Sequence, residues 1–286
     1  MAPKLAKTNK AVIPGFYGSM PNGTIKTFSR GGSDVTGSIV ARATKAKLYE
    51  NWTDVSGCLI CDPRIVNNPE PIKTITYREL RELAYMGATV LHEDAIFPVR
   101  AAGIPVNIKN TNQPEDRGTM IVSESAEHCD HIITGIAGKK GMSVINIEKD
   151  KMNSEIGFGK NVLRALEKSN VSFEHMPSGV DTMSVVIATE ALAGKETAII
   201  DEIKSRVHPD QIYIESNLAL IAVVGRGMKS ARGTAAILFS ALADARVNIK
   251  MIDQGSSELN IIVGVEEEDF EVAIKAIYKR FIGINQ

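Results

Sequence analysis

The sequence predicts an α/β part up to about residue 124, followed by a duplicated α+β part. In the first part, short alternating strand patterns are interleaved with helical patterns. A polar stretch without periodicity, residues 123–130, then marks the best candidate boundary. Beyond it the sequence repeats with an offset of 76 residues, since Gly157 and Ala165 return as Gly233 and Ala241.

Composition excludes several classes of protein. At roughly 100–200 residues per domain, 286 residues make one large domain or two to three small ones. An apolar fraction of 44% excludes wholesale disorder. Thirty-three basic residues nearly cancel thirty-four acidic ones, so no net field attracts nucleic acid or an anionic membrane. Aromatic residues, at 5%, are too few to favour base-stacking surfaces.

Cysteine content and hydropathy indicate the compartment. No apolar run reaches the ~18–20 residues that span a bilayer, and the apolar stretch after the basic start is too short for a signal peptide. Three cysteines are too few for a disulfide scaffold. A reducing cytoplasmic location is therefore expected.

The elements of the first part follow in order along the chain. Strands are predicted at residues 24–28, 46–52, 104–108 and 118–122, and helices at residues 35–46, from 76 onward and at 95–102. Thr76 opens its helix with Glu79 three residues later, which is a capping box, and Gly87 could end that helix.

The repeat predicts two copies of a βαββαβ unit. Its second copy is the clearer one, with strands at 218–224, 247–252 and 258–265 and helices at 233–243 and 268–281. The alternating residues 183–187 fall on 259–263 without a gap. Two unrelated stretches with chance matches are the alternative, which gap-free agreement over about a hundred residues disfavours.

Arg30-Gly31-Gly32-Ser33-Asp34 lies between a predicted strand and a predicted helix. Glycines there let the backbone approach a ligand, and the helix N-terminus offers N–H groups to an anion. Arg30 adds a two-pronged donor suited to carboxylate or phosphate, and Ser33 could donate to the same anion. The simpler alternative is an ordinary N-cap after a glycine turn.

Thr53-Asp54 and the turn at Asp62-Pro63-Arg64 follow a second predicted strand. Open α/β sheets bind ligands at the carboxyl edges of their strands, and the turn would aim Arg64 by fixed geometry. An Asx turn with a solvated arginine is the alternative.

These motifs, in this order, resemble the aspartate kinase family. Gly15-Phe16-Tyr17-Gly18, residues 87–92 and Gly118-Thr119 fit the same family. The repeat resembles its two ACT modules, most closely at residues 220–228 and 253–261. The resemblance implies part of a three-layer amino-acid-kinase lobe followed by tandem ACT domains of ferredoxin-like βαββαβ fold.

The resemblance implies ATP-dependent phosphorylation of the β-carboxylate of L-aspartate to 4-phospho-L-aspartate, at the start of lysine, threonine and methionine synthesis. A carboxylate is already a nucleophile at neutral pH, so the chemistry needs positioning and positive charge rather than a general base. Mg²⁺ would be held largely by phosphates and waters, and no metal-ligand set is expected from the protein.

The roles of individual site residues are inferred only from the resemblance to the family. The catalytic loop would be Arg30, Gly31, Gly32, Ser33 and Asp34. The aspartate pocket would consist of Phe16, Gly18, Arg30 and Ser33. The nucleotide would meet Thr53, Asp54, Leu59, Arg64 and Thr89.

Three departures from the family pattern qualify these roles. Leu59 stands where many members have an aromatic residue, and Thr89 where some have lysine. The Lys-x-Gly-Gly segment that clamps phosphate in the family is not found. The chain is therefore expected to begin about halfway through the kinase domain and to give no turnover by itself.

The resemblance also implies feedback regulation by lysine or threonine at the seam of paired ACT modules, in a homodimer or tetramer. The effector residues would be Met152, Ser154, Ser172, Phe173, Glu174, Ser178 and Asp181. Surface solvation of Glu174 and Asp181 is the alternative. Domain limits are expected at 1–124 for the kinase part, 142–216 for an inserted first ACT domain, and 131–141 plus 217–286 for the second.

Other readings stay open at this point. A non-catalytic, amino-acid-sensing ACT subunit with a vestigial half-lobe is the main alternative, and another amino-acid-kinase-fold enzyme is a weaker one. Cys58-x-x-Cys61 has no second cysteine pair and is expected to be packing rather than a metal site. His128-Cys129-Asp130-His131 could chelate an ion only if fixed geometry converged its ligands.

Overall fold

A computed structural model describes residues 7–8, 10–28, 31–88, 93–124 and 131–283, and the chain divides into two compact units. The first unit takes residues 1–137 and 223–234, and the second takes residues 138–222 and 235–286. This division differs from the expected limits, because residues 223–234 of the C-terminal half belong to the first unit. The expected domain limits remain a prediction.

The first unit contains two sheets and three helices among its described residues. Its strands are β1 (Tyr17–Ser19), β2 (Ile25–Thr27), β3 (Tyr49–Thr53), β4 (Thr74–Thr76), β5 (Val106–Asn110) and β6 (Thr119–Val122). Its helices are α2 (Gly32–Thr44), α3 (Tyr77–Tyr85) and α4 (Glu93–Ala101), and the short 3₁₀ segment η2 (Arg226–Lys229) also belongs to it. The expected strands and helices match β2, β3, β5, β6, α2, α3 and α4 to within a few residues, whereas β1, β4 and η2 were not predicted.

A four-stranded mixed sheet, in the order β3-β5-β6-β4, forms the centre of the first unit. β3 and β5 are parallel, so their carboxyl ends, Thr53 and Asn110, lie side by side. β1 and β2 form a separate antiparallel ribbon in which Tyr17 faces Thr27.

Small residues along α2 explain its position. A Cβ at Gly37 would lie 2.5 Å from the Tyr49 hydroxyl, so only glycine allows this approach to β3. The Ser38 hydroxyl is fully buried and accepts a hydrogen bond from the Val99 N–H of α4 at 3.2 Å. The small-residue pattern of the sequence is therefore a packing pattern.

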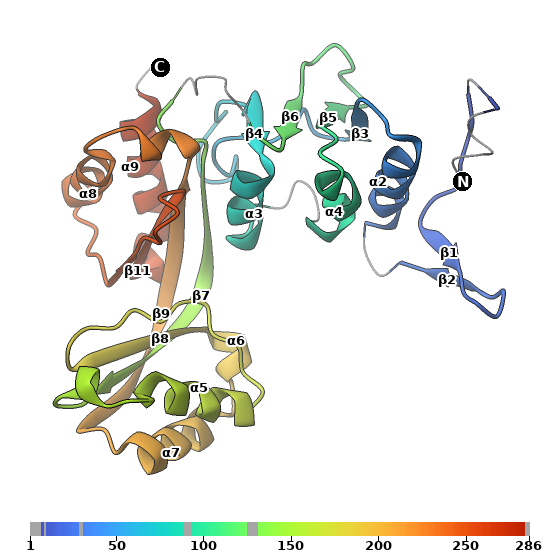
Figure 1. The fold of residues 1–286 in the computed structure, drawn as a ribbon. Helices are drawn as coiled ribbons and strands as arrows, with labels where there is room; N and C mark the ends of the chain where they lie inside the picture. The colour runs from blue at the N-terminus through green and yellow to red at the C-terminus, as the bar shows by residue number, and fades with distance from the viewer. Residues whose placement is uncertain (1–6, 9, 29–30, 89–92, 125–130, 284–286) are drawn as a thin grey trace. The chain divides into compact units, whose positions relative to one another are not determined.

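The second unit is built on a five-stranded sheet in the order β10-β11-β9-β7-β8 (Figure 1). Its strands are β7 (Gly135–Glu148), β8 (Thr182–Ala188), β9 (Gln211–Val224), β10 (Met251–Asp253) and β11 (Asn260–Glu266). Its helical segments are η1 (Met152–Ser154), α5 (Phe158–Lys168), α6 (Thr189–Leu192), α7 (Glu196–Val207), α8 (Thr234–Asp244), η3 (Glu267–Asp269) and α9 (Phe270–Ile282). β7 and β9 are each 14 residues long.

The main core of the second unit lies between the sheet and two helices. Ile145 and Ile147 of β7 pack there with Val162 of α5 and with Ile199 and Ile203 of α7. All five side chains are fully buried. The alternation of β7 therefore points one set of residues at these helices and the other set at the opposite face.

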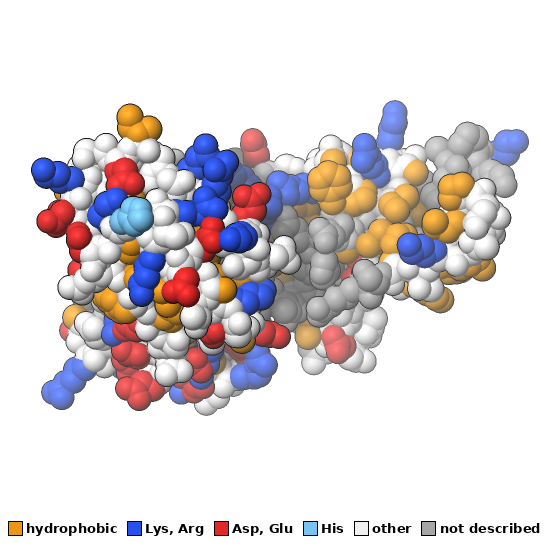
Figure 2. Space-filling view, turned by 90° about the horizontal axis from the view of Figure 1, so that it is seen from below, with side chains coloured by type: hydrophobic (Ala, Val, Ile, Leu, Met, Phe, Trp, Pro, Cys, Tyr) orange, Lys and Arg blue, Asp and Glu red, His pale blue; other side chains and the backbone are white. Residues whose placement is uncertain are grey.

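The surface carries charges of both signs. In the view of Figure 2, lysine and arginine side chains are interspersed with aspartate and glutamate, in agreement with a net charge of −1. Among the helices that the structure describes, none is long and apolar enough to cross a bilayer.

Candidate functional site

The loop before β1 packs against the start of α2. A Cβ at Gly32 would lie 2.8 Å from the Phe16 Cα, so only glycine admits this contact. The Phe16 N–H donates to the Thr36 Oγ1 at 3.2 Å, and Ser33 lies beside Gly15. Phe16 has a φ of 63° and leaves 56% of its area exposed. The structure thus brings Phe16, Gly32 and Ser33 together at the start of α2, and their role in binding stays a prediction.

The N-cap residue of α2 is Gly31, which has a φ of 57° and provides no side-chain cap. A helix start without a cap leaves N–H groups available to an anion. Arg30, the predicted carboxylate ligand, lies outside the described residues. Gly18 lies in β1, one residue beyond the Phe16–Tyr17 pair.

Asp34 is held in the first turn of α2 by β3. Its Oδ1 accepts a hydrogen bond from the Asn51 Nδ2 at 2.9 Å, and that amide also donates to the Tyr49 hydroxyl at 3.2 Å. This polar cluster orients the Asp34 carboxylate. The sequence predicted Asp34 but not Asn51, whose position inside a strand gave no sign of such a role.

The carboxyl ends of β3 and β5 carry a cluster of polar side chains. Asn110 donates to the Ser56 Oγ at 2.9 Å, and Ser56 donates to the Asp116 Oδ2 at 2.5 Å. The Thr53 carbonyl accepts hydrogen bonds from the Thr111 N–H and hydroxyl. The predicted Thr53 and Asp54 therefore lie at a polar sheet edge. Asn110 could have been found by the same strand-end argument.

The chain leaves this edge through Gly57, which has a φ of 104°. A Cβ there would lie 2.4 Å from the Thr119 Oγ1, and that hydroxyl accepts from the Cys58 N–H at 2.8 Å. Leu59 follows with its side chain 37% exposed. A single exposed leucine is common on protein surfaces and does not by itself mark a binding site.

Arg64 is held by Asp62 rather than pointing freely. The guanidinium makes bonds of 2.6–3.1 Å to both carboxylate oxygens, although the Arg64 side chain is 87% exposed. The Arg64 hydrogen bond holds the pKa of Asp62 below its usual range. Thr89, the other predicted nucleotide contact, lies outside the described residues.

The cysteines of the CxxC motif are buried free thiols. Burial raises the pKa of Cys58 and of Cys61 to about 12. No group of three or more metal-binding side chains occurs among the described residues, and His128, Cys129 and Asp130 lie outside them. His131 lies within them, and its Nε2 is 3.0 Å from the Glu70 Oε2.

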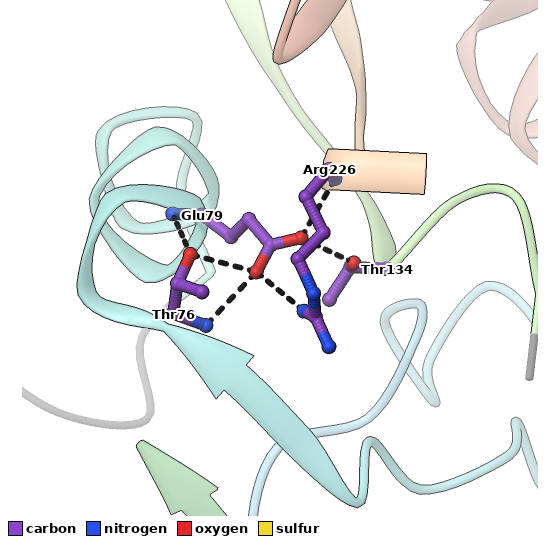
Figure 3. Close-up of polar contacts among 4 residues, drawn as sticks. All are labelled: Thr76, Glu79, Thr134 and Arg226. Carbon is purple, nitrogen blue, oxygen red and sulfur yellow. Dashed lines mark hydrogen bonds and ion pairs between the residues drawn. The ribbon is translucent and has the colours of Figure 1, made fainter. Parts of the chain in front are cut away.

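A buried ion pair within the first unit was not predicted from the sequence (Figure 3). Glu79, with no exposed area, accepts from the Thr76 N–H and hydroxyl, the Thr134 hydroxyl, and the N–H and Nη1 of Arg226 at 2.6–2.9 Å. Burial opposes its charge, but the hydrogen bonds from Thr134, Arg226 and Thr76 outweigh burial and hold the pKa of Glu79 below its usual range. The capping box was predicted and is confirmed. No sequence pattern indicated that Arg226, which is 147 positions from Glu79, would pair with it.

The predicted effector residues lie in the second unit, several of them around one loop. Met152 and Ser154 form η1, whose Asn153 N–H donates to the Val180 carbonyl, and Asp181 accepts from the Lys151 N–H at 2.8 Å. Ser178 belongs to the same turn and bridges to Met183. Ser172 and Phe173 are exposed. Glu174 is mostly buried and bonds to Lys139 at 2.7 Å, so surface solvation does not describe it.

Comparisons with known protein families match two segments of the chain. Residues 3–110 match the amino acid kinase family, and residues 221–281 match the ACT domain. One segment of the chain is therefore similar to the amino acid kinase family and another is similar to the ACT domain. The second ACT domain stays a prediction.

The particular relatives are aspartokinases, and the chain is homologous to them over nearly its whole length. Aspartokinase 3 of Bacillus subtilis is 44% identical over 271 residues, which are 94% of this chain and 60% of the relative. The crystal structure of Clostridium acetobutylicum aspartate kinase has a TM-score of 0.92 and 60% identity, over 98% of this chain and 64% of that one. Escherichia coli aspartokinase III in complex with aspartate and ADP has a TM-score of 0.73 and 27% identity, over 93% and 59%. The chain thus spans about 60% of the length of these relatives.

Proposed function

We propose that the chain provides aspartate- and nucleotide-binding elements of an aspartate kinase together with the unit that regulates it. The reaction is ATP-dependent phosphorylation of the L-aspartate β-carboxylate to 4-phospho-L-aspartate, in the cytoplasm, at the start of lysine, threonine and methionine synthesis. The observation that carries the proposal is the packing of Gly15 on Ser33 and of Phe16 on Gly32 at the uncapped start of α2. The homology to aspartokinases supports it.

In this proposal, the start of α2 binds aspartate. Its free N–H groups and Ser33 receive a substrate carboxylate, Arg30 adds a planar pair of donors, and Phe16 and Gly18 line the pocket. Asp34, oriented by Asn51, organises the phosphoryl site. The complex of E. coli aspartokinase III with aspartate and ADP supports this choice of substrates.

ATP would bind at the polar edge formed by β3 and β5. Thr53 and Asp54 contact the nucleotide, Leu59 offers an apolar side chain, and Arg64 and Thr89 reach its phosphates. Arg64 must give up its bonds to Asp62 to do so. Mg²⁺ would be held largely by ATP phosphates and waters, in line with its preference for keeping several water ligands.

The positive charge of the proposed site explains how its groups would assist phosphoryl transfer. The β-carboxylate attacks as an anion, so no residue need remove a proton from it. The barrier is the approach of one anion to another, and positive charge with fixed orientation lowers it. Arg30, Arg64 and the N-terminus of α2 supply that charge.

Aspartyl-hydroxamate formation tests the kinase proposal. The chain is joined to the part of C. acetobutylicum aspartate kinase that lies outside the match, and turnover is measured with ATP, Mg²⁺ and aspartate. Arg30→Ala should lower kcat/KM about 100-fold or more, whereas Arg42→Ala on the exposed last turn of α2 should not. Equal activity of the two variants would contradict the role of Arg30.

The regulatory part of the proposal concerns lysine or threonine. Two ACT modules, 142–216 inserted into 131–141 plus 217–286, would associate with a second copy and bind the effector near η1 and Asp181. The complex of E. coli aspartokinase III with lysine and aspartate supports lysine as an effector. A non-catalytic sensing subunit remains the second candidate, because all candidate effector residues lie in one compact unit. Lysine or threonine binding in calorimetry without ATP, combined with an inactive fusion, would favour it.

A further inference from the structure

The buried carboxylate of Glu79 has no part in the proposed phosphoryl transfer, yet it joins three separated segments of the first unit (Figure 3). Its Oε2 accepts from Thr76 within the capping box, which the helix would form by itself. Its Oε1 accepts from the Thr134 hydroxyl at 2.6 Å and from the Arg226 N–H at 2.8 Å. Glu79 therefore holds two distant segments of the chain in addition to beginning α3.

The first of these segments, residues 133–136, is also hydrogen-bonded at two points through its backbone. The Thr134 N–H donates to the Val224 carbonyl, and the Ile136 N–H donates to the Ile60 carbonyl, each at 2.7 Å. Thr134 is 6% exposed, Ile136 3% and Ile60 4%, so water is not at hand to replace these bonds. The position of this segment therefore determines where the Ile60 carbonyl finds its partner.

Ile60 belongs to residues 57–64, which carry three of the proposed nucleotide-loop side chains and which we call the nucleotide loop. The Ile60 N–H donates to the Glu70 carbonyl at 2.9 Å, and the Ile72 N–H donates to the Cys58 carbonyl at 2.8 Å. The loop is thus bonded to residues 70–72 through one set of backbone groups and to Ile136 through the Ile60 carbonyl. Leu59 is the neighbour of Ile60 in the chain, so its place depends on both attachments.

A close contact with α3 fixes residues 133–136 a second time. Leu83 lies one helical turn after Glu79 and is 4% exposed. A Cβ at Gly135 would lie 2.7 Å from the Leu83 Cδ1 and 3.4 Å from the Ile60 carbonyl oxygen. Gly135 therefore packs closely on the helix and on the loop, so a shift of this segment would displace Ile60 as well.

We propose that Glu79 is a positioning residue for nucleotide binding. Through Thr134 it holds residues 133–136 against Ile60, and it thereby keeps the nucleotide loop in one arrangement. Arg226 balances the charge of Glu79, so the carboxylate can accept these bonds while it stays buried. A nucleotide that meets a loop already in place does not have to order it, which raises the affinity. The nucleotide part of this inference rests on the proposed function, whereas the control of the loop by Glu79 does not.

Two measurements on the full chain test the proposal. Hydrogen exchange followed by mass spectrometry reports the opening of residues 57–64 relative to α2, and calorimetry with ADP and Mg²⁺ as the probe reports nucleotide affinity. Comparison with α2 separates local opening of the loop from loss of the whole fold. Thermal unfolding confirms that each variant is folded at the temperature of the measurements.

The variants differ by single hydroxyl groups. Thr134→Val removes the hydroxyl that binds Glu79 and keeps the branched shape of the side chain, and Thr134→Ser keeps the hydroxyl. Tyr77→Phe is the matched control, because it also removes a buried hydroxyl beside α3, one that donates to the Ile104 carbonyl at 2.7 Å.

Thr134→Val should raise the exchange of residues 57–64 relative to α2 about tenfold. It should also weaken ADP binding roughly three- to tenfold, because a smaller fraction of the chain has the loop in place. Thr134→Ser should recover most of both losses, and Tyr77→Phe should change neither by more than about twofold.

The two measurements distinguish failure of this inference from failure of the proposed function. If Thr134→Val and Tyr77→Phe give the same exchange ratio, Glu79 does not control the loop and the inference is wrong, whatever the affinity for ADP. If Thr134→Val raises the ratio but the affinity for ADP is unchanged, or the wild-type chain binds no ADP, Glu79 controls the loop but the proposed nucleotide contacts are wrong, and the role in nucleotide binding fails with them.

Discussion

At the scale of single residues, Glu79 is the most constrained charge that the structure describes. It has no exposed area, and its two carboxylate oxygens accept five hydrogen bonds from three residues. Arg226 supplies the opposite charge at 2.8 Å. Removing one partner of a buried pair strands the other charge, which costs more than the pair contributes.

Glu79→Gln should therefore lower the free energy of unfolding by roughly 3–5 kcal/mol, since the Arg226 guanidinium would stay buried without a counter-ion. Urea unfolding followed by circular dichroism measures the change. Glu115→Gln, on the exposed surface of the same unit, should change the free energy by less than about 0.5 kcal/mol. Equal effects of the two substitutions would show that the ion pair does not stabilise the fold.

The loss of unfolding free energy caused by Glu79→Gln should depend on pH in a definite direction. The pKa of Glu79 is lower in the folded chain than the value of 4.5 for a free glutamate, so its stabilisation is complete above about 4.5. This stabilisation is lost as the pH falls through the pKa that Glu79 has in the folded chain. The gap in unfolding free energy between wild type and Glu79→Gln should stay constant from about pH 7 to about 4.5 and shrink below. A gap that widened on acidification would contradict the assignment.

The two buried cysteines should be unreactive. With pKa values of about 12, each thiol is ionised to about one part in ten thousand at pH 8. In a Cys129→Ser background, a thiol reagent should give almost no colour with the folded protein and two equivalents in urea. Rapid reaction of the folded chain would show that Cys58 or Cys61 is accessible.

At the scale of elements, close backbone contacts fix the loops around the candidate site. Gly57 illustrates this, since its φ of 104° and its contact with Thr119 both require glycine. Gly23 has a φ of 81°, but a Cβ there would meet nothing within 4 Å, so it shares only the first requirement. Comparing substitutions at these two glycines therefore separates the cost of a positive φ from the cost of a steric clash.

Gly57→Ala should cost roughly 3 kcal/mol or more, because the new methyl group would displace Thr119 and break its bond to the Cys58 N–H. Gly23→Ala should cost only about 1 kcal/mol through its positive φ. Thermal and urea unfolding measure both. Similar costs would mean that the Thr119 contact relaxes easily.

Local patterns were predictable and distant pairings were not. The Thr76–Glu79 capping box, the start of α2 and the alternation of β8 depend on residues a few positions apart, and the sequence located them. The strand predicted at 247–252 shortens to Met251–Asp253, and that at 218–224 lengthens to Gln211–Val224. Strand ends depend on which neighbour provides hydrogen bonds, and periodicity does not contain that information.

The site shows the same limit. The structure brings Phe16 and Ser33 to the same helix start. Asn51 and Ser56 were not predicted, because each acts through a partner at least 17 positions away, whereas Asn110 lies at a strand end and was overlooked. Arg64 was expected to face a phosphate, but in the structure the nearer Asp62 holds it. An ion pair two residues apart forms at little cost in chain entropy, so it wins when no ligand competes.

At the scale of the whole molecule, the first unit is assembled from separated parts of the chain. Residues 223–234 return to it from the C-terminal half, carrying Arg226 to Glu79. Gly225 fits against Ile133, where a Cβ would lie 2.7 Å from the Ile133 Cα. Neither contact can form in a chain that ends before residue 223.

A fragment of residues 1–137 should therefore fold poorly, although it contains every strand of the four-stranded sheet. It leaves Glu79 buried without Arg226. Glu79→Leu in the fragment should recover part of the lost stability, whereas the same change should destabilise the full chain. Circular dichroism melting of the four proteins measures this reversal, and a fragment as stable as the full chain would contradict it.

The boundaries between the two units fall inside hydrogen-bonded strands. β7 crosses between Ala137 and Gly138, and β9 crosses between Ala222 and Val223. A loop tolerates insertions of any length, but a strand has a side-chain period of two. One residue inserted at Ala222 would exchange the faces of Val223 and Val224, which are both fully buried, so each would have to pack where the other packs now. At these junctions a single inserted residue therefore has to be absorbed as a bulge, whereas an insertion of two residues keeps every side chain on its own face.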